Sequence, residues 1–268
     1  MRHYKNLYNH NYIMENQINS YEIKPETVNE LSIEKKEKKN NLEFEIPNNI
    51  FQTWQTKKLP IKMFQAIKKL RESNPRFRYY LFDDNDCRNF IRNNFDKQVL
   101  NAYDRLIPGA YKADLWRYCI LYKYGGIYLD IKYYPVNGFK LFNLLKKEHW
   151  VLDNDKHGIY NALMVCKPNN EILLKAINQI VLNVKNKFYG NGFLEPTGPG
   201  LLAQYFTNEQ KEKFDTKHIL TGQHDFDKYI LFNNHKILKC YPGYFNERGK
   251  YSTKKHYSEL WKQRNIYL

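Results

Sequence analysis

The stretch from residue 111 to residue 135 constrains the fold more than any other, because it predicts a long helix that leads directly into a strand. The run YKADLWRYCILYKY predicts the helix, and Gly125 and Gly126 follow it at once. A double glycine is a strong signal for the end of a helix. The next run, IYLDIKYYP, is typical of a strand that ends at Pro135. This unit indicates an α/β layered domain.

The same alternation continues on both sides of this unit. The run at 61–74 predicts an amphipathic helix with Met63, Ile67 and Leu70 on one stripe. Strands interleaved with helices predict an α/β fold with a mostly parallel mixed sheet flanked by helices. We expect strands at 46–54, 76–84, 127–135, 149–153, 159–166, 229–232 and 236–242, and further helices at 86–95, 97–106, 170–188 and from 197 onward.

Composition divides the chain into a polar extension and one large domain. Hydrophobic residues make up 42% of the 268 residues, which is ample material for a core. Residues 1–43 are polar and end in the charged run SIEKKEKKNN, so we expect a flexible extension in front of a domain at 44–268. No apolar run approaches the ~18–20 residues of a membrane span, and the first residues lack a signal peptide's apolar stretch. We therefore expect a cytoplasmic protein without a transmembrane segment.

Several residues that could form sites have simpler structural interpretations. The four cysteines are far apart, with no CxxC pair and no zinc-type spacing. Cys119 and Cys166 lie in apolar stretches, where we expect buried free thiols. Asp83 and Asp84 follow a predicted strand, and we expect an aspartate here to cap the next helix rather than to form an acidic site.

The net charge of +15 leaves the class of partner open. A basic chain favours nucleic acid, anionic lipid or phosphorylated ligands. The alternative is compositional, because lysine, asparagine, isoleucine and tyrosine all have AT-rich codons. Aromatic residues are abundant, at 16%, but no pattern typical of base stacking on nucleic acid is present. Core packing explains them better, and we do not expect a nucleic-acid partner.

Two short segments carry candidate chemistry. Asp114 and Arg117 are three residues apart and therefore share one helix face, either as a surface ion pair or as a polar pair that binds sugar hydroxyls in a cleft. Strand alternation predicts that Tyr128, Asp130 and Lys132 share one face. An aspartate near the carboxyl end of a strand could hold a divalent cation on a diphosphate, or could pair with the lysine on a solvated face.

Three motifs in order resemble one enzyme family. They are I-P-x-x-I-x-Q-T-W from residue 46, N-P-x-F-x-Y-x-L-F-D-D from residue 74, and A-D-x-x-R-Y-x-I-L-Y-x-Y-G-G-I-Y-L-D from residue 113. Together they resemble the glycosyltransferases with a DXD-containing sugar-binding region, the group of the yeast-type initiating α-1,6-mannosyltransferase (glycosyltransferase family 32). The resemblance extends from about Ile46 to Trp261, and the stretch from Lys112 to Asp130 is its most specific part.

The resemblance implies a GT-A-type fold, a nucleotide diphosphate sugar donor and retention of anomeric configuration. It implies that Trp54 packs near the nucleotide base and that Asp114 and Arg117 grip the donor sugar and phosphate. It also implies a cleft lined by Thr197-Gly198-Pro199 and closed by the element from His256 to Trp261. The implied donor-binding set is Trp54, Tyr111, Asp114, Arg117, Gly126, Asp130, Gly198, Pro199 and Trp261, and the implied catalytic set is Asp114, Arg117, Asp130 and Lys132.

Lys132 departs from the family pattern, because the second acid of the DXD motif stands at this position. A protonated lysine has no acceptor for a metal ion. Three interpretations remain open. Asp130 could hold Mn²⁺ or Mg²⁺ together with His256 and Glu259, or Lys132 could itself supply the positive charge. In the third, Lys132 points away and the protein is a degenerate transferase.

We therefore expect transfer of a hexose from GDP-mannose or a UDP-hexose to a hydroxyl of a glycan or glycolipid. The alternative is a catalytically degenerate member that binds nucleic acid or another anionic polymer, with a steep salt dependence. A third interpretation is a protein peripheral to a membrane surface that uses its lysine-rich extension to bind anionic lipid.

Overall fold

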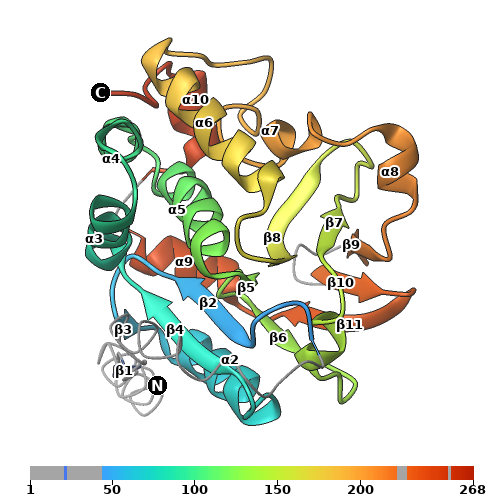
Figure 1. The fold of residues 1–268 in the computed structure, drawn as a ribbon. Coiled ribbons are helices and arrows are strands. Elements are labelled where there is room, and N and C mark those ends of the chain that lie inside the picture. Colours follow the sequence, from blue (N-terminus) through green and yellow to red (C-terminus); the bar gives the residue numbers. More distant parts are fainter. Residues whose placement is uncertain (1–20, 23–43, 222–227, 253–254) are drawn as a thin grey trace, which may run out of the picture.

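The computed structural model describes residues 21–22, 44–221, 228–252 and 255–268 (Figure 1). Its centre is a nine-stranded sheet in the order β4-β2-β5-β8-β7-β9-β10-β11-β6. Beside this sheet, β1 (Tyr21–Glu22) and β3 (Lys58–Leu59) form a small antiparallel pair. Apart from β1, the expected N-terminal extension at 1–43 lies outside the described residues.

The first part of the sheet is parallel. β2 (Asn49–Thr53) lies between β4 (Arg78–Phe82) and β5 (Gly126–Leu129), and both pairings are parallel. Parallel neighbours need long crossover connections, and helices provide them here. The carboxyl ends of these strands therefore meet at one edge of the sheet. The connecting helices are α2 (Ile61–Ser73), α3 (Asp84–Asn94), α4 (Lys97–Arg105) and α5 (Gly109–Tyr124).

The remaining sheet is largely antiparallel, so the expectation of a mostly parallel sheet is wrong although the mixed α/β class is confirmed. Within the nine-stranded sheet of the described residues, five neighbouring pairs are antiparallel and three are parallel. A short connection explains one of these pairs, since two residues with positive φ, Asn233 and Asn234, join β10 to β11. The strands are β6 (Tyr133–Pro135), β7 (His149–Leu152), β8 (Ile159–Cys166), β9 (Thr216–Leu220), β10 (Lys228–Phe232) and β11 (His235–Cys240).

Helices cover both faces of the sheet, and strand side chains alternate between two cores. In β5, Ile127 and Leu129 enter one core and Tyr128 enters the other. The Tyr128 side is covered by α3, α4, α5 and α6 (Glu171–Lys185) (Figure 1). The opposite side is covered by α2 and the 3₁₀ helix η3 (Leu141–Leu144). The other helices are α7 (Pro199–Ala203), α8 (Asn208–Glu212), α9 (Tyr244–Tyr251) and α10 (Tyr257–Lys262).

Several local expectations are confirmed. Met63, Ile67 and Leu70 are buried on one side of α2. Asp83 caps α3, where its side chain accepts a hydrogen bond from the backbone N–H of Asp86. All four cysteines are buried free thiols. Within the described ranges, no helix has the length and apolar content that crossing a bilayer requires.

The expected strand at 127–135 is interrupted at the position of the DXD motif. β5 ends at Leu129, residues 131–132 form a turn, and β6 begins at Tyr133. The backbone N–H of Tyr133 donates to the carbonyl of Asp130 at 3.0 Å across this turn. Asp130 and Lys132 therefore do not share a strand face, and the turn brings their side chains together instead. Alternation along a strand applies only while the backbone stays extended.

Gly125 joins α5 to β5 in a conformation that other residues rarely adopt. Its φ is +62°, and an added Cβ would lie 2.6 Å from Pro168 Cδ. We expect Gly125→Ala to lower the free energy of unfolding by about 2–5 kcal/mol, because the left-handed backbone and the steric overlap both cost energy. Urea unfolding measures this change. Gly249→Ala, on α9 with no atom within 4 Å of the added Cβ, is the control and should change stability by less than about 1 kcal/mol. Equal effects of the two variants would contradict this account.

Candidate active site

A cavity of about 780 Å³ opens where β2 and β5 end. Trp54 directly follows β2 and Asp130 directly follows β5, so both line it. Helix α5 forms one wall. The carboxyl ends of parallel strands are the usual ligand-binding edge of an α/β sheet. Nine of the residues expected from the sequence line this cavity: Trp54, Tyr111, Asp114, Arg117, Asp130, Lys132, Gly198, Pro199 and His256.

Helix α5 fixes the segment at 193–198 with three side chains spaced along one face. Tyr111 Oη donates to the Phe193 carbonyl at 2.6 Å, and Tyr118 Oη donates to the Thr197 carbonyl at 2.9 Å. Between them, Asp114 Oδ2 accepts from Thr197 Oγ1 at 2.7 Å. Spacings of three and four residues place these side chains in one row. The helix therefore determines where this segment meets the cavity.

The Asp114 carboxylate is buried and already has three partners. Besides Thr197, Oδ1 accepts from Asn161 Nδ2 at 2.9 Å and lies 3.4 Å from the Arg117 guanidinium. Burial raises the pKa of Asp114 above its ordinary value, although Arg117 and the two hydrogen bonds act in the opposite direction. An added Cβ on Gly198 would lie only 3.1 Å from Oδ2. A carboxylate has about four acceptor positions, so roughly one remains for a ligand.

Arg117 is a buried cation shared by two carboxylates, those of Asp114 and Asp130. Its side chain is only 7% exposed, and Nη1 lies 3.4 Å from Asp130 Oδ1. Nη1 also donates to the Asn161 carbonyl at 2.8 Å, and the guanidinium lies over the Tyr128 ring at 4.3 Å. Burial acts to lower the pKa of Arg117, but Tyr128 and both carboxylates raise it further above its ordinary value. Arg117 thus links α5 to the end of β5 and to β8.

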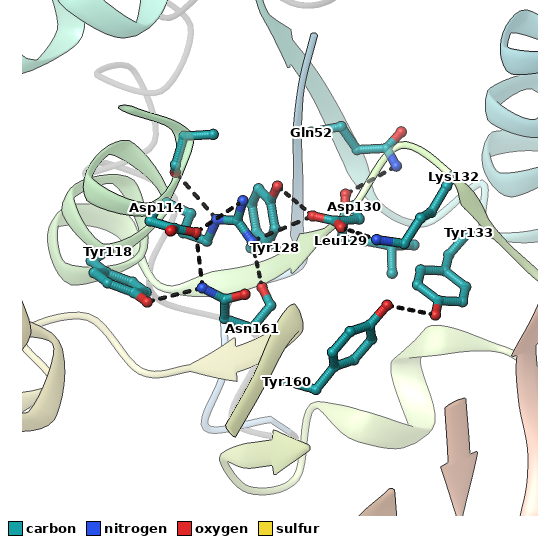
Figure 2. A network of polar contacts seen from close by, with 12 residues as sticks. Gln52, Asp114, Tyr118, Tyr128, Leu129, Asp130, Lys132, Tyr133, Tyr160 and Asn161 are labelled. Carbon is teal, nitrogen blue, oxygen red and sulfur yellow. Dashed lines mark hydrogen bonds and ion pairs between the residues drawn. The ribbon is translucent and has the colours of Figure 1, made fainter. Parts of the chain in front are cut away.

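Lys132 occupies the position next to Asp130 that the DXD pattern gives to a second acid. Its ammonium forms an ion pair with Asp130 Oδ2, while Tyr128 Oη donates to Oδ1 at 2.8 Å (Figure 2). Burial alone would raise the pKa of Asp130, but Lys132 and Arg117 hold it below its ordinary value. Burial likewise opposes the charge on Lys132, yet Asp130 raises its pKa. The pair is ionised, and Lys132 points toward the site rather than away from it.

The metal ligands expected from the sequence do not come together. Glu259 is exposed and does not line the cavity, and His256 Nδ1 is hydrogen-bonded to Ser258 Oγ at 2.7 Å. Burial and Arg248 lower the pKa of His256. The described residues contain no group of three His, Cys, Asp or Glu side chains that could hold a metal ion. Both Asp130 oxygens are engaged, and an ammonium lies where a second oxygen ligand would be needed, so these side chains do not fit a divalent cation.

Two of the expected donor-binding residues have structural positions instead. Gly126 lies outside the cavity lining, and an added Cβ there would lie 2.8 Å from the Asn49 carbonyl oxygen. Trp261 also lies outside the lining, where its Nε1 donates to the Tyr189 carbonyl at 2.7 Å and its ring packs edge-on against Phe193. Trp261 therefore supports a cavity wall rather than forming its surface.

Other residues in the cavity were not identified from the sequence. Asn161 links Asp114 to Tyr118, and Tyr160 Oη is hydrogen-bonded to Tyr133 Oη at 2.9 Å. The strand run IYNALMVC contained a signal for Asn161, because an asparagine inside an apolar strand needs a polar partner. The remaining side chains come from distant segments and gave no local signal. The charged ones among them are Asp153, Lys228, Arg248 and Lys255.

Comparison with known proteins identifies the central part of the chain. Residues 60–151 match the family described as "Glycosyltransferase sugar-binding region containing DXD motif", and this range includes Asp114, Arg117, Asp130 and Lys132. This segment is therefore similar to a glycosyltransferase sugar-binding region. The resemblance found in the sequence motifs is thereby confirmed. The mixed sheet flanked by helices agrees with the α/β class expected from the sequence.

Curated relatives share this region. Inositol phosphoceramide mannosyltransferase 3 of Schizosaccharomyces pombe is 35% identical over 136 residues, which cover 50% of this chain and 37% of that protein. Initiation-specific alpha-1,6-mannosyltransferase of Candida albicans is 32% identical over 91 residues, covering 32% of this chain and 24% of that protein. The match thus spans well under half the length of these relatives. Among solved structures, PaToxG glycosyltransferase has a TM-score of 0.46 and 18% identity, covering 59% of this chain and 67% of that one.

Proposed function

We propose that residues 44–268 form a retaining glycosyltransferase domain that transfers a hexose from a nucleotide diphosphate sugar to a hydroxyl acceptor. The observation that carries this proposal is the buried network of Asp114, Arg117, Asp130 and Lys132 on the wall of the large cavity. All four residues belong to the matched sugar-binding region. A surface ion pair would contribute little, whereas a buried network that faces a cavity is typical of a binding site.

The charges around the cavity suit a diphosphate. Lys132 and Arg117 lie on one side, and three further cations from the C-terminal part of the chain, Lys228, Arg248 and Lys255, line the same cavity. A fixed ammonium ~4 Å from a phosphate gains about 4 kcal/mol at an effective dielectric constant near 20. The pairing of Lys132 with Asp130 reduces this gain, since a phosphate must share the same ammonium. Preorganised cations of this kind stabilise a departing diphosphate.

The metal dependence follows from the same arrangement. Relatives with the full DXD motif have two acids where this chain has Asp130 and Lys132. We infer that Lys132 supplies part of the positive charge that a metal ion would supply to the diphosphate. Mn²⁺ or Mg²⁺ should therefore add less to the affinity for the diphosphate here than in a protein with two acids at these positions.

The donor and the chemistry can be stated in more detail. Trp54 lines the cavity beside the end of β2, where it could pack against a nucleotide base, and the two mannosyltransferase relatives favour a mannose donor. In the proposed reaction, the sugar C1–O bond to the diphosphate breaks and the acceptor oxygen bonds to C1 on the same face. The acceptor proton passes to the departing phosphate oxygen. Arg117 and Lys132 stabilise the negative charge that develops on the diphosphate.

A thermal-shift panel tests this proposal with GDP, UDP, GDP-mannose and UDP-glucose in the presence of a chelator. A ligand at 100 times its Kd stabilises the folded state by ~2.7 kcal/mol, which should raise the Tm by roughly 5–10 °C. We expect at least one nucleoside diphosphate to produce such a shift, and AMP to produce a smaller one. If no diphosphate shifts the Tm while single-stranded DNA does so at low salt, the degenerate binding protein is the better account.

A further inference from the structure

A second cavity, of about 520 Å³, adjoins the first. The two share a wall, because Phe193 and Leu194 line both. This wall is held by the Tyr111 hydrogen bond from α5 and by the packing of Trp261 against Phe193. The proposed donor site occupies the first cavity and leaves the second without an assigned role. A transferase, however, needs a second substrate site next to its donor site.

Asp153 lies where the two cavities meet. It lines the first cavity, and an added Cβ on Gly158, which lines the second, would lie 3.6 Å from Asp153 Oδ2 and 3.3 Å from Pro199 Cβ. Asp153 is 9% exposed. Its Oδ1 has two partners, the backbone N–H of Asn154 and His218 Nδ1, both at 2.8 Å. No hydrogen bond from the described part of the chain reaches Oδ2, so this oxygen remains available to a ligand.

His218 holds Asp153 in this orientation. It is 5% exposed, and its ring stacks on Tyr160 with centroids 3.8 Å apart and planes at 5°. Because a carboxylate only accepts hydrogen bonds, Nδ1 carries the proton that it donates to Asp153 Oδ1. Tyr160 in turn lines the first cavity. Stacking on Tyr160 thus fixes the imidazole, which binds Asp153 Oδ1. Asp153 Oδ2 is the oxygen that remains for a ligand at the junction of the two cavities.

The lining of the second cavity combines an aromatic ring, small residues and acceptors. Phe193 provides the ring, and Gly192 and Gly200 leave backbone surface open. Asp155 and Glu195 provide carboxylates, and the lining described for this cavity contains no lysine or arginine, although the chain carries a net +15. Carboxylates accept hydrogen bonds from hydroxyls and repel phosphate. This chemistry suits a neutral polyol.

We propose that the second cavity binds a neutral, polyhydroxylated acceptor such as a hexoside, and that Asp153 Oδ2 accepts a hydrogen bond from an acceptor hydroxyl at the junction. The inference rests on the proposed transferase function and specifies its acceptor. It places the sugar-like part of the acceptor against Phe193, between Asp155 and Glu195. A phosphorylated form of the same sugar should bind more weakly, because it meets two carboxylates and no lining lysine or arginine.

The test measures binding of methyl α-D-mannopyranoside and of mannose 6-phosphate by protein-observed NMR, with and without saturating GDP or UDP. We expect millimolar affinity for the neutral glycoside and at least tenfold weaker binding of the phosphate. Gly192→Leu should lower the glycoside affinity at least tenfold, because an added Cβ there meets nothing closer than 3.8 Å and the side chain fills the second cavity. Asp153→Asn, which keeps an acceptor for His218, should also lower the glycoside affinity.

Gly249→Leu is the reciprocal variant, because Gly249 lines only the first cavity. It should weaken nucleotide binding and leave glycoside binding within twofold of wild type. Glycoside binding that is absent from the wild type, or unchanged in Gly192→Leu, would overturn the acceptor proposal even if nucleotides bind. Absence of nucleotide binding with glycoside binding intact would overturn the proposed transferase function instead.

Discussion

Arg117→Met is expected to lower the free energy of unfolding by about 3–5 kcal/mol and to abolish nucleotide binding. The guanidinium lies between Asp114 and Asp130, both largely buried, so its removal leaves Asp114 without a cation and leaves Asp130 with Lys132 alone. Its hydrogen bond to the Asn161 carbonyl is also lost. Urea unfolding measures the stability change, and calorimetric titration with GDP and UDP measures binding under conditions where the variant is folded.

Arg88→Met is the matched control. Arg88 donates two hydrogen bonds of 2.7 Å to Asp104, which are shorter than the 3.4 Å contacts of Arg117 with its carboxylates. The side chains of Arg88 and Asp104 are, however, 42% and 36% exposed. An exposed pair contributes at most about 1 kcal/mol, so this variant should remain stable and bind nucleotide normally. If Arg117→Met costs no more than Arg88→Met, the network is not a structural unit of the site. If the folded Arg117→Met variant still binds GDP or UDP with wild-type affinity, Arg117 does not hold the diphosphate.

Local sequence patterns predicted the part of the fold that local physics determines. The run from Tyr111 to Pro135 gave the helix, its glycine stop and the following strand, because helix periodicity and left-handed glycines act over a few residues. The same patterns placed Asp114 and Arg117 on one helix face. They also placed Asp130 at the carboxyl end of a strand, where a cavity is found.

Other features depend on contacts between distant segments, which no local pattern carries. The antiparallel half of the sheet could not be inferred from strand–helix alternation, because pairing partners are chosen by the whole fold. The turn at 131–132 escaped prediction, since IYLDIKYYP alternates like one continuous strand. Asp153 became a candidate only when the structure placed His218 against it, 65 residues later in the chain. Glu259 was a plausible ligand by spacing, but the orientation of α10 leaves it exposed.

Lys132→Asp is expected to change the cation requirement of nucleotide binding. The variant restores two acids at the DXD positions but removes the ammonium that is paired with Asp130. Losing one charged contact to the diphosphate costs about 1.5–3 kcal/mol, which is roughly ten- to hundredfold in affinity. We therefore expect affinity for GDP or UDP to fall by that factor in EDTA and to recover when Mn²⁺ is added. Lys132→Met, which restores no acid, should lose the same affinity and should not recover with Mn²⁺.

The wild-type protein provides the most direct test of the central claim, that Lys132 supplies charge to the diphosphate in place of part of a metal ion's charge. The measurement is calorimetric titration with GDP and UDP, first in EDTA and then in Mn²⁺. The account predicts binding of at least one of them in EDTA, with an affinity that Mn²⁺ raises less than tenfold. Binding that is absent in EDTA and restored by Mn²⁺ would contradict it, because a metal would then be required at a site where Lys132 already stands beside Asp130.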